Sequence, residues 1–302
     1  MPDATTALIA GPWTHRDYAV NGVRLHVAEA GQGPLVLLVH GFPGFWWSWR
    51  HQIPVLAQAG FRVMAPDLRG YGASDKPPRG YDAVTASADL AGLIRTAGER
   101  DAVVVGHDWG GLLSWSVAAL HPRVVQRLVV LSMPHPRRLR TAPLRVGGQL
   151  RPLGPLLGAQ LPRLPESRLT RDDGALVARL LRARIAPGWP AEDLRAAEER
   201  YAEAICIPQA AYGALEYARW AIRSLPRGDG RRWARAMATP IDAATLHLQG
   251  GADPYLLPAS ADGSGRYVAG DYDFRLLPGV GHHPHEERPA EITALITDWA
   301  RG

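Results

Sequence analysis

The stretch VVVGHDWGG (103–111) leads an apolar run into a carboxylate flanked by glycines. The run predicts a buried strand, the glycines a tight turn and the residues after them a helix, so Asp108 falls at the turn. Its carboxylate is ionised at neutral pH and can attack carbon without help from a base. Attack on a saturated carbon would leave an alkyl ester on Asp108, which water can cleave at the ester carbonyl.

A serine at this turn would suit acyl transfer, whereas on a saturated carbon it would form an ether that activated water does not readily cleave. The aspartate therefore predicts hydrolysis at an sp3 carbon, in which an epoxide opens to a diol or a halide is displaced to give an alcohol. There is also a structural alternative, because an aspartate at a strand end is often only a helix cap.

Cleavage of the ester needs a general base and a group that orients this base. Asp253 stands just past the run ATLHLQGG and His282 follows LLPGVG, so both are expected at strand ends. His283 and His285 compete with His282 for the role of base. Asp253, taken alone, is equally compatible with an ordinary loop carboxylate.

The tetrahedral intermediate of ester cleavage also needs hydrogen-bond donors. The backbone N–H groups of Trp109, directly after Asp108, and of Phe42, in the segment HGFPG, are the candidates for this oxyanion hole. The run HHPH (282–285) resembles a metal-ligand cluster, but the sequence has no second ligand group at zinc spacing. No metal or cofactor is therefore predicted.

A parallel sheet has to position these groups. Apolar runs that end in glycine or a polar residue predict its strands, at 34–41, 61–70, 101–108, 127–134 and 244–253. Helical patterns such as 89–98 and 111–122 lie between the runs, and Asn21-Gly22 predicts an antiparallel hairpin before them. The alternation predicts an α/β fold with a mostly parallel, doubly wound sheet.

Residues 134–226 interrupt this alternation, because they hold several helical patterns and no clear strand. We interpret them as an inserted helical cap, between a first part of the core at 1–133 and a second part at 227–302. Ligands of open α/β sheets bind beyond the carboxyl ends of the strands, so a cap inserted there would cover the crevice and exclude water.

Composition excludes several other classes of function. The chain has 302 residues and a formal charge of +5, but its arginines are scattered and form no basic stripe with aromatic residues, so no nucleic-acid partner is predicted. No apolar run approaches the roughly 20 residues that span a bilayer, and no secretion signal is recognised, so we expect a cytoplasmic protein without a membrane partner. The single cysteine, Cys206, excludes internal disulfides and has no neighbouring base.

Three segments together resemble the α/β-hydrolase-fold epoxide hydrolases: HGFPGFWWSWRHQIPVLAQAGFRVMAPDLRGYGASDKP, VVVGHDWGG and GVGHHPHEERPAEI. The resemblance covers the chain outside the cap and implies the order nucleophile, acid, histidine. In that family the histidine precedes a glutamate and a proline at fixed offsets, which Glu287 and Pro289 match for His282. The resemblance thus implies a triad of Asp108, Asp253 and His282 that acts on a small molecule.

The cap departs from the family pattern. Epoxide hydrolases of this family place two cap tyrosines over the nucleophile to donate hydrogen bonds to the epoxide oxygen, whereas the matching positions here hold Pro155 and Ala218. Tyr217 is the best substitute donor and Tyr212 the next. The alanine would also widen the pocket, which suits a bulky or polycyclic substrate.

Two other functions stay open. Haloalkane and fluoroacetate dehalogenases share the triad, and Trp109 with a cap tryptophan, Trp189 or Trp220, would bind their halide, although Phe42 has no side-chain donor. A hydrolase fold turned into a binder or a non-hydrolytic catalyst is the third class, against which the retained triad argues. The sequence leaves the oligomeric state open, a homodimer included.

Overall fold

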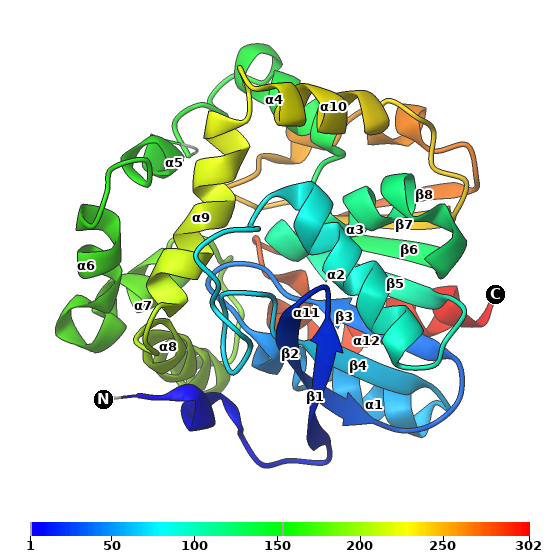
Figure 1. The fold of residues 1–302 in the computed structure, drawn as a ribbon. Helices are drawn as coiled ribbons and strands as arrows, with labels where there is room; N and C mark the ends of the chain where they lie inside the picture. The colour runs from blue at the N-terminus through cyan, green and yellow to red at the C-terminus, as the bar shows by residue number, and fades with distance from the viewer. Residues whose placement is uncertain (1, 153) are drawn as a thin grey trace.

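The computed structural model describes residues 2–152 and 154–302, built around an eight-stranded sheet in the order β1-β2-β4-β3-β5-β6-β7-β8 (Figure 1). The strands are β1 Thr14–Val20, β2 Val23–Ala30, β3 Leu35–Val39, β4 Arg62–Pro66, β5 Ala102–His107, β6 Val125–Leu131, β7 Ala244–Gly250 and β8 Tyr272–Leu277. The α-helices are α1 Gln52–Gln58, α2 Ala83–Thr96, α3 Trp109–Leu120, α4 Pro136–Arg145, α5 Gly154–Gly158, α6 Leu164–Thr170, α7 Ala175–Arg182, α8 Ala191–Ile205, α9 Ala210–Arg223, α10 Gly228–Ala236, α11 Pro284–Glu287 and α12 Pro289–Arg301. Short 3₁₀ helices are η1 Ala4–Ala7, η2 Trp46–Trp49, η3 Pro122–Val124, η4 Arg171–Gly174, η5 Pro258–Ser260 and η6 Ser264–Tyr267.

The sheet begins with the predicted hairpin. β1 pairs antiparallel with β2 across Asn21 and Gly22, whose φ angles of 45° and 75° are the positive values that a tight two-residue hairpin turn requires. β2 also pairs antiparallel with β4, and all other neighbouring strands are parallel. The prediction of a mostly parallel α/β sheet is confirmed.

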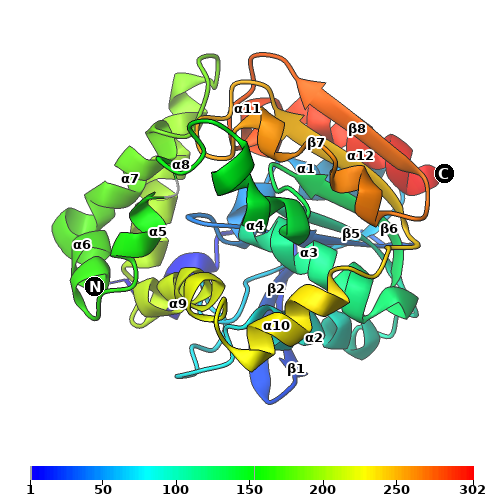
Figure 2. The ribbon, with the colours of Figure 1, turned by 90° about the horizontal axis from the view of Figure 1, so that it is seen from above.

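The strand order creates a crevice for a site. β3 lies between β4 and β5, so the direction in which successive strands are added reverses there, and ligands bind at the carboxyl ends of strands next to such a reversal. β3 and β5 are buried along their whole length, because α2 and α3 cover one face of the sheet and α1 and α12 the other (Figure 2). The residues that follow β3 and β5 therefore meet at this crevice.

Between β6 and β7 the described residues form the helices α4–α10 and no strand of the sheet. Helices α5–α9 stand together at one side of the sheet in both views (Figures 1 and 2). Helix α10, beyond the predicted cap boundary at 226, packs on the core, where Trp233 Nε1 donates to Ser116 Oγ of α3 over 3.1 Å. The exact division at 134 and 226 stays a prediction.

Among the described residues, no helix combines the length and the apolar character needed to cross a bilayer.

Candidate active site

Asp108 occupies a sharp turn between β5 and α3. Its φ of 50° and ψ of −121° lie outside the ordinary regions for a non-glycine residue, a conformation that costs on the order of 1–3 kcal/mol and is typical of functional sites. A Cβ at Gly106 would come within 2.2 Å of Ser114 Oγ, and one at Gly110 within 2.2 Å of the Val39 carbonyl oxygen. The two glycines are thus required by the close approach of the turn to its surroundings.

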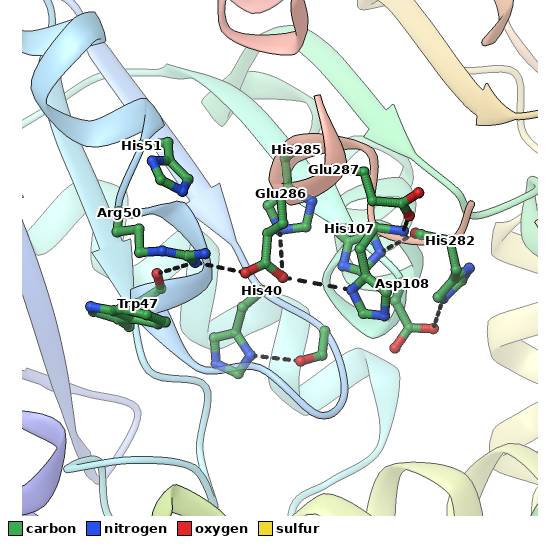
Figure 3. Close-up of polar contacts among 12 residues, drawn as sticks. His40, Trp47, Arg50, His51, His107, Asp108, His282, His285, Glu286 and Glu287 are labelled. Carbon is green, nitrogen blue, oxygen red and sulfur yellow. Dashed lines mark hydrogen bonds and ion pairs between the residues drawn. The ribbon is translucent and has the colours of Figure 1, made fainter. Parts of the chain in front are cut away.

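The carboxylate of Asp108 is buried and held from two sides. The backbone N–H of Phe42, which follows β3, donates to Oδ2 over 2.9 Å, and Nε2 of His282 lies 3.3 Å from Oδ1. Figure 3 shows the imidazole of His282 directed at this carboxylate. One oxygen therefore lies in a candidate oxyanion hole and the other faces a candidate base.

His282 is held in turn by Asp253. Its Nδ1 lies 2.7 Å from Asp253 Oδ2, while Asp253 Oδ1 accepts hydrogen bonds from the backbone N–H groups of Tyr255 at 2.8 Å and Leu256 at 2.9 Å. His107 Nε2 also bonds to the carbonyl oxygen of His282 over 2.7 Å. The structure thus brings Asp108, His282 and Asp253 together as a continuous chain of contacts.

The surrounding charges determine the protonation states of His282 and Asp108 in the free enzyme. Burial alone would lower the pKa of His282, but the charge of Asp253 and the hydrogen bonds from both aspartates outweigh it and raise the pKa to about 9. Burial would raise the pKa of Asp108, but the hydrogen bond and charge of His282, with the charges of His107 and Arg184, hold it well below its usual value. At neutral pH the resting site therefore contains a carboxylate and an imidazolium.

In the described residues, His282 is the one histidine of the HHPH run that forms a hydrogen bond with Asp108. His285 packs with its ring centroid 4.3 Å from that of Trp49, and His283 has its ring centroid 6.4 Å from that of Trp189. Burial lowers the pKa of both well below the usual value, so both are neutral. Among residues 2–152 and 154–302 no group of three His, Cys, Asp or Glu side chains is arranged to hold a metal ion.

The second predicted oxyanion donor is Trp109. It begins α3, and no hydrogen bond of its backbone N–H is found within the described part of the chain. Such an amide at a helix N-terminus is available for an oxygen anion. Of these two amides, that of Phe42 already donates a hydrogen bond to the Asp108 carboxylate.

The two tyrosines predicted as ring-opening donors do not face Asp108. The hydroxyl of Tyr217 donates to the carbonyl oxygen of Arg69 over 3.0 Å, and that of Tyr212 to the carbonyl oxygen of Pro78 over 2.9 Å. Both hydroxyl protons are therefore used in contacts between the cap and the core. The structure does not support the donor role predicted for either residue.

Two cavities lie near the triad, and of its three residues only Asp108 lines one of them, the smaller. The smaller, of about 170 Å³, is lined by Asp108 and Trp220, and the larger, of about 370 Å³, by Pro155, Ala218 and other residues of the core and cap. Trp109 and Tyr255 line both cavities. The side chains at the two expected tyrosine positions therefore do face the candidate substrate space, and both are apolar.

Sequence reasoning missed two residues that line the larger cavity, Arg184 and Tyr255. Arg184 follows α7 and gave no signal, because it is one of many arginines in the cap. Tyr255 lies two residues after Asp253, so its place in the loop behind the acid was a signal that could have been used. Both are more than nine-tenths buried.

Part of the site also connects the core to the cap. Arg50, directly after η2, forms an ion pair with Glu286 at 2.7 Å (Figure 3) and another with Asp193 of α8 at 2.8 Å. Tyr201 of α8 donates its hydroxyl to the same Glu286 oxygen over 2.5 Å. This buried network joins η2, α8 and α11 behind the histidine loop.

Comparison with known proteins agrees with this fold. The family model described as alpha/beta hydrolase fold matches residues 34–289. Epoxide hydrolase A of Mycobacterium tuberculosis is 33% identical, with 97% of this chain and 98% of the relative covered. The AB hydrolase superfamily protein YfhM of Bacillus subtilis is 38% identical, with 93% and 96% covered.

Among solved structures, Epoxide Hydrolase A from Mycobacterium thermoresistibile superposes with a TM-score of 0.79 at 32% identity and covers 96% of this chain and 98% of its own. The fold and site define an α/β-hydrolase with an aspartate at the turn between β5 and α3. Within that class, the chain belongs to the epoxide hydrolase family.

Proposed function

We propose that this protein opens an epoxide to a vicinal diol through a covalent ester on Asp108. The observation that carries the proposal is the chain of contacts from Asp108 through His282 to Asp253, at 3.3 Å and 2.7 Å. Asp108 attacks an epoxide carbon, the carbon–oxygen bond of the ring breaks, and the carboxylate becomes an ester. Water activated by His282 then attacks the ester carbonyl, and the diol leaves.

The order of these steps follows from the charges in the site. Formation of the ester removes the negative charge of Asp108, which helps to keep His282 protonated, so the pKa of His282 falls from about 9. The imidazole can then lose its proton and act as a base towards water. Asp253 retains its charge and stabilises the imidazolium that forms again during hydrolysis.

We place the carbonyl oxygen of the ester, which becomes the oxyanion when water attacks the carbonyl carbon, in the oxyanion hole of Phe42 and Trp109. The amide of Phe42 already donates to Asp108 Oδ2. The amide of Trp109 has no hydrogen-bond partner among the described residues, so it can donate to the same oxygen. Removal of one such donor generally costs about 10²–10³ in kcat. The substrate belongs to the bulky or polycyclic epoxides, which the apolar cavity of about 370 Å³ at Pro155 and Ala218 would accept.

A single-turnover reaction in ¹⁸O-labelled water tests the covalent mechanism. With enzyme in excess over styrene oxide, the first diol should contain unlabelled oxygen from Asp108, and the label should enter the carboxylate instead. Asp108→Ala should abolish turnover, and His282→Gln should accumulate the ester as a mass adduct. Label in the first diol would contradict the proposal, because water would then have attacked the epoxide directly.

A dehalogenase is the second candidate, and one observation favours it. The indole N–H of Trp220 is buried in the described structure without a partner, and Trp220 lines the smaller cavity with Asp108 and Trp109. Trp189 cannot take this role, because its N–H donates to Asp193 over 2.7 Å. Release of chloride or bromide from haloalkanes, without turnover of epoxides, would select this alternative.

The cytoplasmic location predicted from the sequence belongs to the proposal, and cell fractionation tests it.

A further inference from the structure

Ring opening requires hydrogen-bond donors to the epoxide oxygen, and the cap lacks tyrosines at the two positions expected to supply them. As Asp108 attacks carbon, negative charge develops on the epoxide oxygen, and back-side displacement puts this oxygen on the side of the carbon remote from Asp108. The larger cavity is lined by Phe42, Trp109 and Tyr255, which neighbour the triad residues in the chain or in space, and otherwise by cap residues, among them Pro155 and Ala218. Neither has a side-chain donor, so other groups must stabilise and protonate the oxygen.

Arg184 is a buried cation on the cap side of the cavity. Its guanidinium carbon lies 3.9 Å from the ring centroid of Tyr255 and 5.5 Å from that of Phe42. No hydrogen bond or ion pair of the guanidinium is found among residues 2–152 and 154–302, although only 8% of the residue is exposed. Its nitrogens do not belong to the fully buried polar atoms that lack a partner, so they are accessible at the cavity that Arg184 lines, and their N–H groups can donate to a ligand there.

Tyr255 supplies a hydroxyl at the same place. Its backbone N–H donates to Asp253 over 2.8 Å, and its ring centroid lies 5.0 Å from that of His282 in an edge-to-face arrangement. The hydroxyl has no hydrogen-bond partner in the described structure, in contrast to the hydroxyls of Tyr217 and Tyr212. Tyr71 also has a buried hydroxyl without a partner there, but its side chain lines neither cavity.

We propose that Arg184 and Tyr255 replace the cap tyrosines in ring opening. The guanidinium of Arg184 stabilises the oxygen that leaves the epoxide carbon, and the hydroxyl of Tyr255 gives this oxygen its proton. The inference rests on the proposed epoxide hydrolysis and assigns two further catalytic residues to it. Both belong to the cavity wall that includes Phe42, one coming from the cap and the other from the loop behind Asp253.

The protons balance over one turnover. In the first half, a bond forms from Asp108 to carbon, the carbon–oxygen bond of the ring breaks, and the oxygen takes the proton of Tyr255. The imidazolium of His282 then returns a proton to the phenolate of Tyr255, which leaves His282 neutral. In the second half, water gives one proton to His282 and one to the departing alcohol, and Asp108 is again a carboxylate.

The surrounding charges favour this sequence. Burial raises the pKa of Tyr255 to about 12, the charge of Arg184 lowers it, and the charges of Asp108 and Asp253 raise it. Esterification of Asp108 removes one of the two charges that oppose ionisation of Tyr255. The phenol therefore becomes a stronger acid during the same step in which the epoxide oxygen becomes a base, and the cation over its ring stabilises the phenolate.

The rate of ester formation tests the proposal, measured by rapid quench and intact-protein mass spectrometry with styrene oxide. Tyr255→Phe should slow this step by about 10²- to 10⁴-fold and Arg184→Gln by about 10²- to 10³-fold. Arg184→Lys, which keeps the charge, should restore part of the loss. Tyr217→Phe is the matched control, because it removes a hydroxyl that donates to a backbone carbonyl, and it should form the ester at nearly the wild-type rate.

Three controls separate the possible failures. Far-ultraviolet circular dichroism and thermal melting establish that each variant is folded, and His282→Gln must accumulate the ester in the same assay. If it does, and folded Tyr255→Phe forms the ester at the wild-type rate, this inference is wrong while the proposed function stands. If neither the wild-type protein nor His282→Gln reacts with styrene oxide or with phenanthrene 9,10-oxide, the proposed function itself fails.

A second substrate distinguishes another role for Arg184. Phenylglycidate carries a carboxylate next to its epoxide, whereas styrene oxide is neutral. A catalytic Arg184 requires that Arg184→Gln slow ester formation with both compounds. A loss confined to phenylglycidate would overturn the proposal, because Arg184 would then bind the substrate carboxylate and not the epoxide oxygen.

Discussion

The backbone N–H of His282 donates to the carbonyl oxygen of Arg184 over 2.8 Å, so the end of α7 is attached directly to the histidine loop. Glu287 reinforces this attachment, because one of its oxygens accepts from the backbone N–H groups of Ala186 at 3.0 Å and Gly281 at 2.8 Å. The geometry of His282 thus depends on where the cap segment 184–186 lies. A cap that shifted at this point would move the base away from Asp108.

Glu287→Ala should weaken both folding and catalysis. The change leaves backbone N–H groups of Ala186, Gly281 and His283 without their acceptor in a buried loop, and each unmet donor generally costs about 1–3 kcal/mol. Urea denaturation should show a lower free energy of unfolding. Glu199→Ala, at an exposed position of α8, is the control and should change the free energy of unfolding by less than about 0.5 kcal/mol.

Asp253→Asn should slow hydrolysis of the ester more than its formation. Loss of the Asp253 charge removes the largest cause that raises the pKa of His282, so this pKa should fall below the value of about 9 in the wild-type protein. An NMR titration of the imidazole measures the shift. We expect kcat to fall by about 10²- to 10⁴-fold, with ester accumulating. An unchanged His282 pKa in the folded variant would contradict the assigned contact.

The raised pKa of His282 should appear in the pH dependence of stability. The pKa is about 9 in the folded state and 6.5 for a histidine without these contacts, as in the unfolded chain, so the contribution is fully present below pH 6.5 and is lost as the pH rises to 9. The shift corresponds to about 3 kcal/mol. Urea denaturation at pH values across this interval should show the decline in the wild-type protein and a flatter dependence in His282→Gln.

Arg50→Met should destabilise the protein strongly, since it leaves the buried Glu286 without its cationic partner. Removal of one member of a buried ion pair generally costs about 3–5 kcal/mol. Thermal or urea unfolding measures the loss. Arg200→Met is the matched control, because the Arg200–Glu203 pair is exposed and such pairs contribute about 0–1 kcal/mol. Equal stability of the two variants would show that the buried network contributes little.

The fold and the position of Asp108 at a turn were predictable because local sequence carries their signals. Apolar runs that end in glycine mark buried parallel strands, and the spacing of Gly106 and Gly110 around Asp108 reflects a turn in which no Cβ fits. His282 was separated from His283 and His285 only by the resemblance to a family, since all three are histidines in one short run.

The cap donors were not predictable in the same way. Whether a tyrosine hydroxyl faces the substrate depends on contacts distant in sequence, and for Tyr217 the partner is the carbonyl oxygen of Arg69 in the core. Arg184 lacks a sequence signal for a similar reason, because its position over Tyr255 arises from the return of the chain to the core after α7. Helical periodicity identifies the buried face of a cap helix and does not identify the partner of each polar atom.

Pro155 and Ala218 give the substrate space an apolar roof, and regioselectivity follows from this. A roof without directional donors distinguishes the two carbons of an epoxide by shape alone. Polar contacts that distinguish the two carbons must then come from the other residues that line the cavity. Replacement of Pro155 or Ala218 by an apolar residue of similar size should therefore not change which carbon is attacked. A donor introduced at Ala218 would give the ring oxygen a second orientation and would redirect attack to the neighbouring carbon.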